Sequence, residues 1–121
     1  MTLYTQMVMF ELMDILFYKT NSGRSPVTRF IDEQPLRDQA SILAVLHEVE
    51  VEGFQAKGAI FRQLDGKLWE IKIKAPSGGY RLLYVLVHST KMIILHAFQK
   101  KTQKTPPIEL ALAKKRLMEV L

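Results

Sequence analysis

The residues of this chain that could do chemistry are mostly basic, and they gather in its second half. Residues 61–121 hold twelve Lys and Arg against four Asp and Glu, a net charge of +8, whereas residues 1–60 hold five against eight, a net charge of −3. A basic half on a small domain is the electrostatic footprint of a protein that binds a polyanion. Lysines that serve solubility alone are the other explanation, because charge by itself is a weak guide.

Part of this positive charge has the spacing of a β-strand. Lys72 and Lys74 alternate with apolar residues, so both lie on one side of an extended segment. Arg81 follows across a predicted tight turn and stands inside an otherwise apolar run, where a charge needs a partner or a function. Its ordinary partner would be Glu70 or an acid on a helix. Because such a cluster can stabilise the charge of a phosphoryl-transfer transition state, Arg81 is a catalytic candidate.

Three more lysines follow the last predicted strand: Lys100, Lys101 and Lys104. Neighbouring strands lie about 4.8 Å apart, so these lysines can converge with the pair on the earlier strand at one face or edge of a sheet. There they could neutralise phosphates. The alternative is a solvated strand face whose lysines guard an edge against aggregation.

Among the three histidines, His96 is the one placed to transfer protons. It lies in the strand predicted at residues 92–98, four residues before the following lysine pair. A neutral imidazole can act as a general acid or base near neutral pH. The alternative is a half-buried histidine with a structural partner. We expect no role for His47, on a helix, or for His88, in a turn.

Several classes of site have no support in the sequence. The chain has no cysteine, which excludes a disulfide-stapled fold, a thiolate zinc site and a thiol nucleophile. It has no HExxH motif, no glycine-rich phosphate loop and no nucleophile elbow for a serine triad. We therefore expect no metal and no cofactor. Of the aromatic residues, we expect Trp69 to be buried and Tyr84 to be more open, on the opposite side of its strand from Arg81.

The pattern of the first half predicts a strand and two helices. Residues 14–19 are rich in strand-forming types. Ser25 followed by Pro26 is typical of a helix start, so a short helix follows. A helical stripe of apolar residues then predicts a second helix over residues 36–52, ended by Gly53.

The second half predicts three strands and a helix. The strands at residues 69–74, 80–87 and 92–98 are joined by short turns, which implies an antiparallel meander. The run 80–87 is apolar on both sides, as in a strand covered on both faces. A final helix begins at Pro106 and Pro107. We therefore predict an α+β fold, a small twisted, mainly antiparallel sheet with two N-terminal helices and a C-terminal helix packed on one face.

The length of 121 residues is that of one domain, which we place at residues 13–121, with residues 1–12 as an N-terminal extension. The apolar start has no preceding Lys or Arg and is interrupted by acids, unlike a signal peptide. No stretch reaches the ~18–20 apolar residues of a membrane span. We expect a cytoplasmic protein that does not bind membranes.

Four segments together resemble the phage-derived HigB-like toxins of the RelE/ParE superfamily. They read RSPV at 24–27, LWEIK at 68–72, YRLLY at 80–84 and LHAFQKKTQKTP at 95–106. The resemblance runs from about residue 13 to 121, and the order of predicted elements, β-α-α-β-β-β-α, is also that of the RelE-like fold.

The resemblance implies the toxin of a type II toxin–antitoxin system. The ribonucleases of this superfamily cut messenger RNA in the ribosomal A site without a metal. The ribose 2′-hydroxyl attacks the adjacent phosphate, which needs a base, an acid and positive charge around the phosphate. The implied partners are the ribosome, messenger RNA and a cognate antitoxin, a helix-turn-helix protein encoded nearby. A ParE-type inhibitor of DNA gyrase and an inactive module that binds nucleic acid or antitoxin are the alternatives.

Active-site residues vary within the superfamily, so the resemblance suggests roles by position. Arg81 would stabilise the phosphate, and His96 or Lys101 would transfer protons. RNA would be bound by the remaining lysines, Lys72, Lys74, Lys100 and Lys104. The C-terminal aromatic residue that some relatives use has no counterpart here, because no Tyr or Phe follows Phe98.

Overall fold

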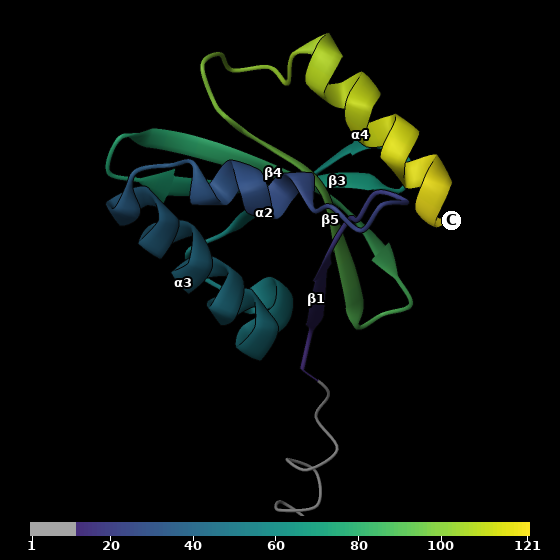
Figure 1. Cartoon of the computed structure of the whole chain (residues 1–121). Coiled ribbons are helices and arrows are strands. Elements are labelled where there is room, and N and C mark those ends of the chain that lie inside the picture. Colours follow the sequence, from purple (N-terminus) through teal and green to yellow (C-terminus); the bar gives the residue numbers. More distant parts are fainter. Residues whose placement is uncertain (1–11) are drawn as a thin grey trace, which may run out of the picture.

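The computed structural model describes residues 12–121, so all but the last residue of the expected extension 1–12 lies outside the described residues. The elements are β1 (Asp14–Phe17), α2 (Pro26–Asp32), α3 (Leu36–Glu52), a short 3₁₀ helix (Gly53–Gln55), β2 (Ile60–Asp65), β3 (Leu68–Ala75), β4 (Gly78–Val87), β5 (Lys91–Gln99) and α4 (Pro107–Val120). Figure 1 shows a twisted sheet with α2 and α3 together and α4 apart from them. The predicted α+β fold is confirmed.

The five strands form one sheet in the order β1-β5-β4-β3-β2. Strands β2 to β5 make an antiparallel meander, and β1 pairs parallel to the first half of β5. Because β1 stops opposite Ile94, the second half of β5 pairs with β4 on one side and, within residues 12–121, has no strand on its other side. The end of β5 carries candidate site residues, so these residues lie beside a free edge of the sheet.

Strand β2 is absent from the predicted order of elements. Its apolar residues, Ile60, Phe61 and Leu64, do not alternate regularly, and a bulge interrupts its pairing with β3. The available signal was the Asp65–Gly66 pair, which favours a hairpin turn; Gly66 has φ +55° there. The segment becomes a strand because β3 offers it an unpaired edge.

The two N-terminal helices form as their sequences predict. Ser25 caps α2, its hydroxyl oxygen accepting from the Thr28 amide, and Pro26 occupies the first turn. In α3 the buried apolar stripe packs on the sheet, and Gly53 ends the helix with φ +63°. Burying an apolar side chain of this size contributes about 1.5–3 kcal/mol, so packing rather than propensity holds these helices.

The helices cover both faces of the sheet, which corrects the expectation that they share one face. α2 and α3 pack on the face that carries Ile71, Ile73, Tyr80, Leu82 and Tyr84. α4 packs through Leu110, Ala113, Leu117 and Val120 on the other face, which carries Leu68, Leu83, Val85 and Leu95. The signal was the run 80–87, because a strand that is apolar on both sides needs a layer on each side.

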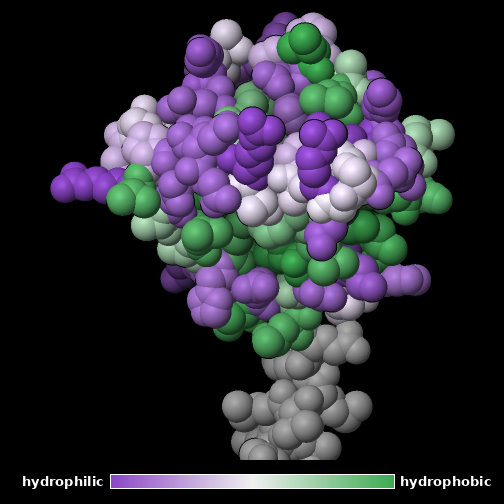
Figure 2. Space-filling model, viewed as in Figure 1, coloured by the Kyte–Doolittle hydropathy of each residue, from purple (hydrophilic) through white to green (hydrophobic). Residues whose placement is uncertain are grey.

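Within residues 12–121, no helix combines the length and the apolarity that crossing a membrane requires. Figure 2 shows hydrophilic and hydrophobic residues mixed on the face in view, with a hydrophobic band across its lower half. β1 and the end of α3 lie in that half in Figure 1 and carry the exposed side chains of Leu16 and Val51.

Candidate functional site

The sheet brings three of the predicted RNA-binding lysines together on its α4 face. Lys72 lies directly opposite Arg81, and Lys74 lies opposite Gly79. The Lys100 side chain passes on the same side of Gly79, and its amide donates to the Gly79 carbonyl oxygen at 2.8 Å. We call the surface formed by Lys72, Lys74 and Lys100 the lysine face. Of the five lysines expected to converge, these three share one face, while Lys101 and Lys104 lie in the loop after β5.

Arg81 lies beneath this surface and has no exposure to solvent. Its Nε lies 3.4 Å from Glu70 Oε1, and its Nη2 donates to the Gln103 carbonyl oxygen at 2.8 Å. Its Nη1 lies 3.5 Å from the Thr105 hydroxyl. The guanidinium therefore ties two strands to the loop that joins β5 to α4. In this arrangement a phosphate can reach Arg81 only if the loop moves.

Glu70 is the partner that the sequence suggested for Arg81, and it is also fully buried. Its second oxygen lies 2.9 Å from Arg62 Nη2, so one carboxylate stands between two arginines. These contacts are ionic rather than well-aligned hydrogen bonds, because neither Glu70 oxygen meets hydrogen-bond geometry. A buried carboxylate is tolerable only with such compensation.

The loop over Arg81 carries the other predicted lysines. Lys104 is exposed and stands between the two residues that bind the Arg81 guanidinium. Lys101 is exposed at the start of the loop, where it lines a pocket of about 370 Å³ along the free edge of β5. We call this the edge pocket. It is lined by Phe30, Gln34, Phe98, Gln99, Lys101, Thr102, Pro106 and Glu109.

His96 is aimed toward α4 by a β-bulge. The pairing of β4 with β5 shifts so that Leu83 faces His96 while Tyr84 faces Ile94, leaving Leu95 as the extra residue. His96 then lies on the α4 face, where its Nε2 is 2.6 Å from Glu109 Oε1. Without the bulge, strand alternation would turn His96 to the face that carries Ile94.

Both ring nitrogens of His96 are engaged. Arg116 Nη1 lies 3.3 Å from Nδ1 and also donates to the Leu95 carbonyl oxygen at 2.9 Å. Burial lowers the pKa of His96 below its ordinary value, although the Glu109 carboxylate opposes this shift. The neutral ring therefore places its proton on Nε2, toward Glu109, and accepts from Arg116 through Nδ1.

A hydrogen-bonded network supports the wall of the edge pocket. The buried Asp38 carboxylate accepts from the Tyr80 hydroxyl at 2.6 Å and from both the amide and the hydroxyl of Ser77. The Tyr80 hydroxyl lies 3.0 Å from Gln34 Oε1, which connects the network to the pocket lining. The Ser77 and Tyr80 donors hold the pKa of Asp38 below its ordinary value.

Glu109, which joins His96 to the edge pocket, is not among the site residues predicted from the sequence. The carboxylate lies in the first turn of α4, thirteen residues after its histidine partner. No local motif links residues at that separation. The only signal was the family-like segment that ends at Pro106, directly before this helix.

Trp69 and Tyr84 do not take part in either surface. Tyr84 is buried rather than open, with 1% of its surface exposed, and burial raises the pKa of its hydroxyl. Trp69 is only half-buried, and both lie on the face opposite Arg81, as strand alternation predicts for Tyr84. With Phe54, Phe61 and Leu86 they line an apolar groove of about 550 Å³.

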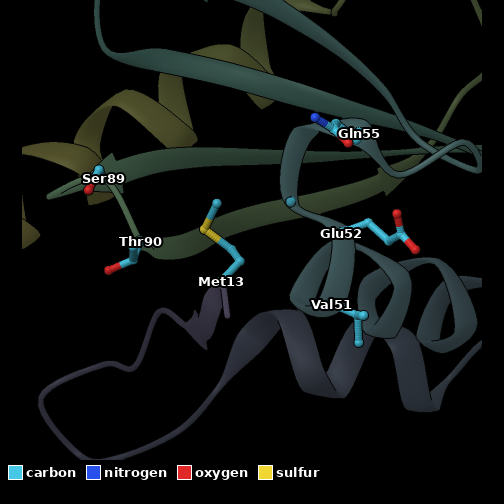
Figure 3. A pocket seen from close by; sticks show the side chains of 7 residues that line it. Met13, Val51, Glu52, Gln55, Ser89 and Thr90 are labelled. Carbon is cyan, nitrogen blue, oxygen red and sulfur yellow. The ribbon is translucent and has the colours of Figure 1, made fainter. Parts of the chain in front are cut away.

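A hollow of about 390 Å³ lies where β1, the end of α3 and the β4–β5 turn meet. Figure 3 shows the Met13 side chain in its middle, with Ser89 and Thr90 on one side and Val51, Glu52 and Gln55 on the other. It contains none of the predicted site residues. Across residues 12–121, no three His, Asp or Glu side chains gather as a metal site.

Comparison with known proteins gives one family. The family model described as phage-derived Gp49-like protein matches residues 29–118, which include both surfaces described above. A comparison with curated proteins returned no match.

Proposed function

The chain belongs to the family of phage-derived Gp49-like proteins, and on that premise we propose that it is the toxin of a type II toxin–antitoxin pair that cleaves messenger RNA on the ribosome. The family is associated with the toxins of toxin–antitoxin systems. The resemblance of its motifs to HigB-like toxins of the RelE/ParE superfamily supports the same conclusion. The observation that carries the nuclease assignment is the lysine face, which lies beside a pocket holding acid–base groups.

The proposed reaction is attack of a ribose 2′-hydroxyl on the adjacent phosphate. This chemistry needs positive charge at the phosphate and groups that move two protons. The lysine face and Lys104 would bind the RNA backbone, and Arg81 would add its charge from beneath. His96 or Lys101 would take part in proton transfer. No metal or cofactor enters this proposal.

The proposed partners follow from charge and family. The ribosome presents the message, so the protein itself needs little sequence specificity. An antitoxin with an acidic or amphipathic segment would cover the lysine face, because complementary charge gives fast, salt-dependent association. A helix-turn-helix protein encoded beside this chain is the expected source of that segment.

Induced expression tests the proposal. Growth and translation should stop, primer extension should show new 5′ ends within messages, and the neighbouring gene should restore growth. A supercoiling assay on the same sample would instead identify a gyrase inhibitor. Soluble protein that leaves growth and messages unchanged would contradict the proposal, and ribosome binding without cutting would identify an inactive module.

A further inference from the structure

We propose that Glu109 is the general base of this reaction and that His96 is the residue that positions it; the inference rests on the function proposed above. The first observation is access to the edge pocket. Glu109 and Lys101 line the pocket, whereas His96 does not. The Glu109 side chain is 28% exposed and that of His96 is 13% exposed. A substrate group in the pocket therefore meets the carboxylate before it meets the imidazole.

The second observation is how the carboxylate is held. His96 Nε2 lies 2.6 Å from Oε1, a short contact of the kind made when the acceptor is ionised. Among residues 12–121, no side chain or amide donates to Oε2. One oxygen of Glu109 is thus anchored, and the other is left for a ligand. A positioned carboxylate with a free oxygen is the geometry that a general base requires.

The third observation is that His96 is occupied on both sides. Arg116 lies at its Nδ1, Glu109 lies at its Nε2, and its ring stacks on Phe98 with centroids 5.8 Å apart. With both nitrogens engaged, the imidazole has none to offer a substrate. Its contacts instead fix where the Glu109 carboxylate lies, as a second group fixes a catalytic base in other active sites.

The fourth observation is the placing of charge in the pocket. Glu109 lies in the first turn of α4, where the helix dipole favours a negative charge. Lys101 lines the same pocket, and no ion pair joins it to Glu109 or to another acid of the described chain. The pocket therefore holds a base and an acid that do not neutralise each other by direct contact.

The step that follows balances its protons. Glu109 Oε2 takes the proton of the ribose 2′-hydroxyl while the 2′-oxygen forms a bond to phosphorus. The bond between phosphorus and the 5′-oxygen breaks, and the Lys101 ammonium gives a proton to the leaving oxygen. The products are a 2′,3′-cyclic phosphate, a 5′-hydroxyl, a protonated Glu109 and a neutral Lys101. Exchange with water restores both side chains.

The test compares two glutamates of one helix. Glu119 also lies on α4 and accepts a hydrogen bond at 2.6 Å, from the Tyr18 hydroxyl, but it does not line the edge pocket. Glu109→Gln and Glu119→Gln change the net charge equally, so a difference in rate between them does not come from net charge. We would measure single-turnover cleavage on programmed ribosomes at saturating toxin, ribosome affinity and a melting curve for each variant.

We expect Glu109→Gln to slow cleavage by about 10²–10⁴-fold at unchanged affinity, and Glu119→Gln to cleave within about twofold of the wild type. Glu109→Asp keeps the carboxylate and should recover part of the cleavage rate. This variant keeps the test decisive if Glu109→Gln folds poorly. His96→Gln should lower the rate and leave the half-saturating toxin concentration unchanged. If the wild type cleaves and Glu109→Gln matches Glu119→Gln, this inference alone is overturned. If the wild type does not cleave, the proposed function fails and takes the inference with it.

Discussion

Buried acids are compensated by different groups on the two faces of the sheet. On the α2/α3 face the one buried acid, Asp38, is satisfied by the neutral donors of Ser77 and Tyr80. On the α4 face the buried acid, Glu70, is compensated by cations instead. Both acids are closed to solvent, with 1% and 0% exposure. The first arrangement completes a core, whereas the second leaves a surplus of positive charge beside the surface.

The cover of the two faces explains this difference. Two helices pack on the first face, while α4 packs on only part of the second, where a lysine-bearing loop lies over Arg81. A surface loop leaves its cations exposed to solvent beside the sheet. The candidate site therefore lies where the helix layer ends and the loop takes over.

The largest expected effect comes from neutralising the acid between the arginines. Glu70→Gln removes the counter-charge of a fully buried Arg81 and should lower the free energy of unfolding by about 3–5 kcal/mol. Urea denaturation of the purified protein measures it. Asp38→Asn is the matched control on the other face and should cost less, because its donors are neutral.

If Glu70→Gln and Asp38→Asn lost the same free energy of unfolding, the two faces would not differ in how they compensate a buried acid. A further check is Glu70→Leu combined with Arg81→Leu, which removes both buried charges together. This pair should recover stability relative to Glu70→Gln, because replacing a whole buried ion pair is often close to neutral.

Removing one lysine of the lysine face should have an intermediate effect, which appears in ribosome binding. Lys72→Ala should leave the unfolding free energy within about 0.5 kcal/mol, because Lys72 is partly exposed, pairs with no acid among residues 12–121 and fills no core position. It should weaken ribosome binding and lower the slope of log affinity against log salt by about one. Lys57→Ala, at an exposed lysine whose amide donates to Glu48 of α3, is the control of equal charge. A matching slope for both variants would mean that the lysine face does not contact phosphate.

The smallest expected effect is the titration of His96. Since burial lowers its pKa in the folded state, the folded protein binds fewer protons than the unfolded chain between that value and 6.5. Stability contributed by the neutral ring is present above the unfolded pKa and declines as pH falls through the folded one. Two-dimensional NMR of the imidazole should show a midpoint below 6.5.

A comparison with Glu109→Gln sharpens this prediction. The Glu109 carboxylate raises the pKa of His96, while burial and Arg116 lower it. Removing that carboxylate should therefore move the midpoint further down. An upward movement would show that the Glu109 carboxylate does not raise the pKa of His96.

Much of the fold could be predicted because its signals are local. The apolar stripe of residues 36–52 with Gly53 at its end predicts α3 with the observed bounds. The alternation around Lys72 and Lys74 predicts β3 and their shared side. β2 could not be predicted in the same way, because its pairing with β3 supplies what its own irregular pattern lacks.

The candidate site was predictable in composition and less so in arrangement. The basic half of the chain and the likeness of 95–106 to HigB-like toxins indicate a lysine-rich site for RNA. They say little of Glu109, which becomes significant only through its contact with His96.

The sequence by itself determined which segments form strands, which form helices and where positive charge accumulates, because periodicity and end signals act over a few residues. Only the tertiary structure decided which groups meet. The bulge at Leu95 turns His96 to the α4 face, and closure of the loop takes Arg81 out of solvent against Gln103. Strand periodicity assigns a side only while the ladder is regular, and partners between distant segments depend on how register and loop closure resolve in the folded chain.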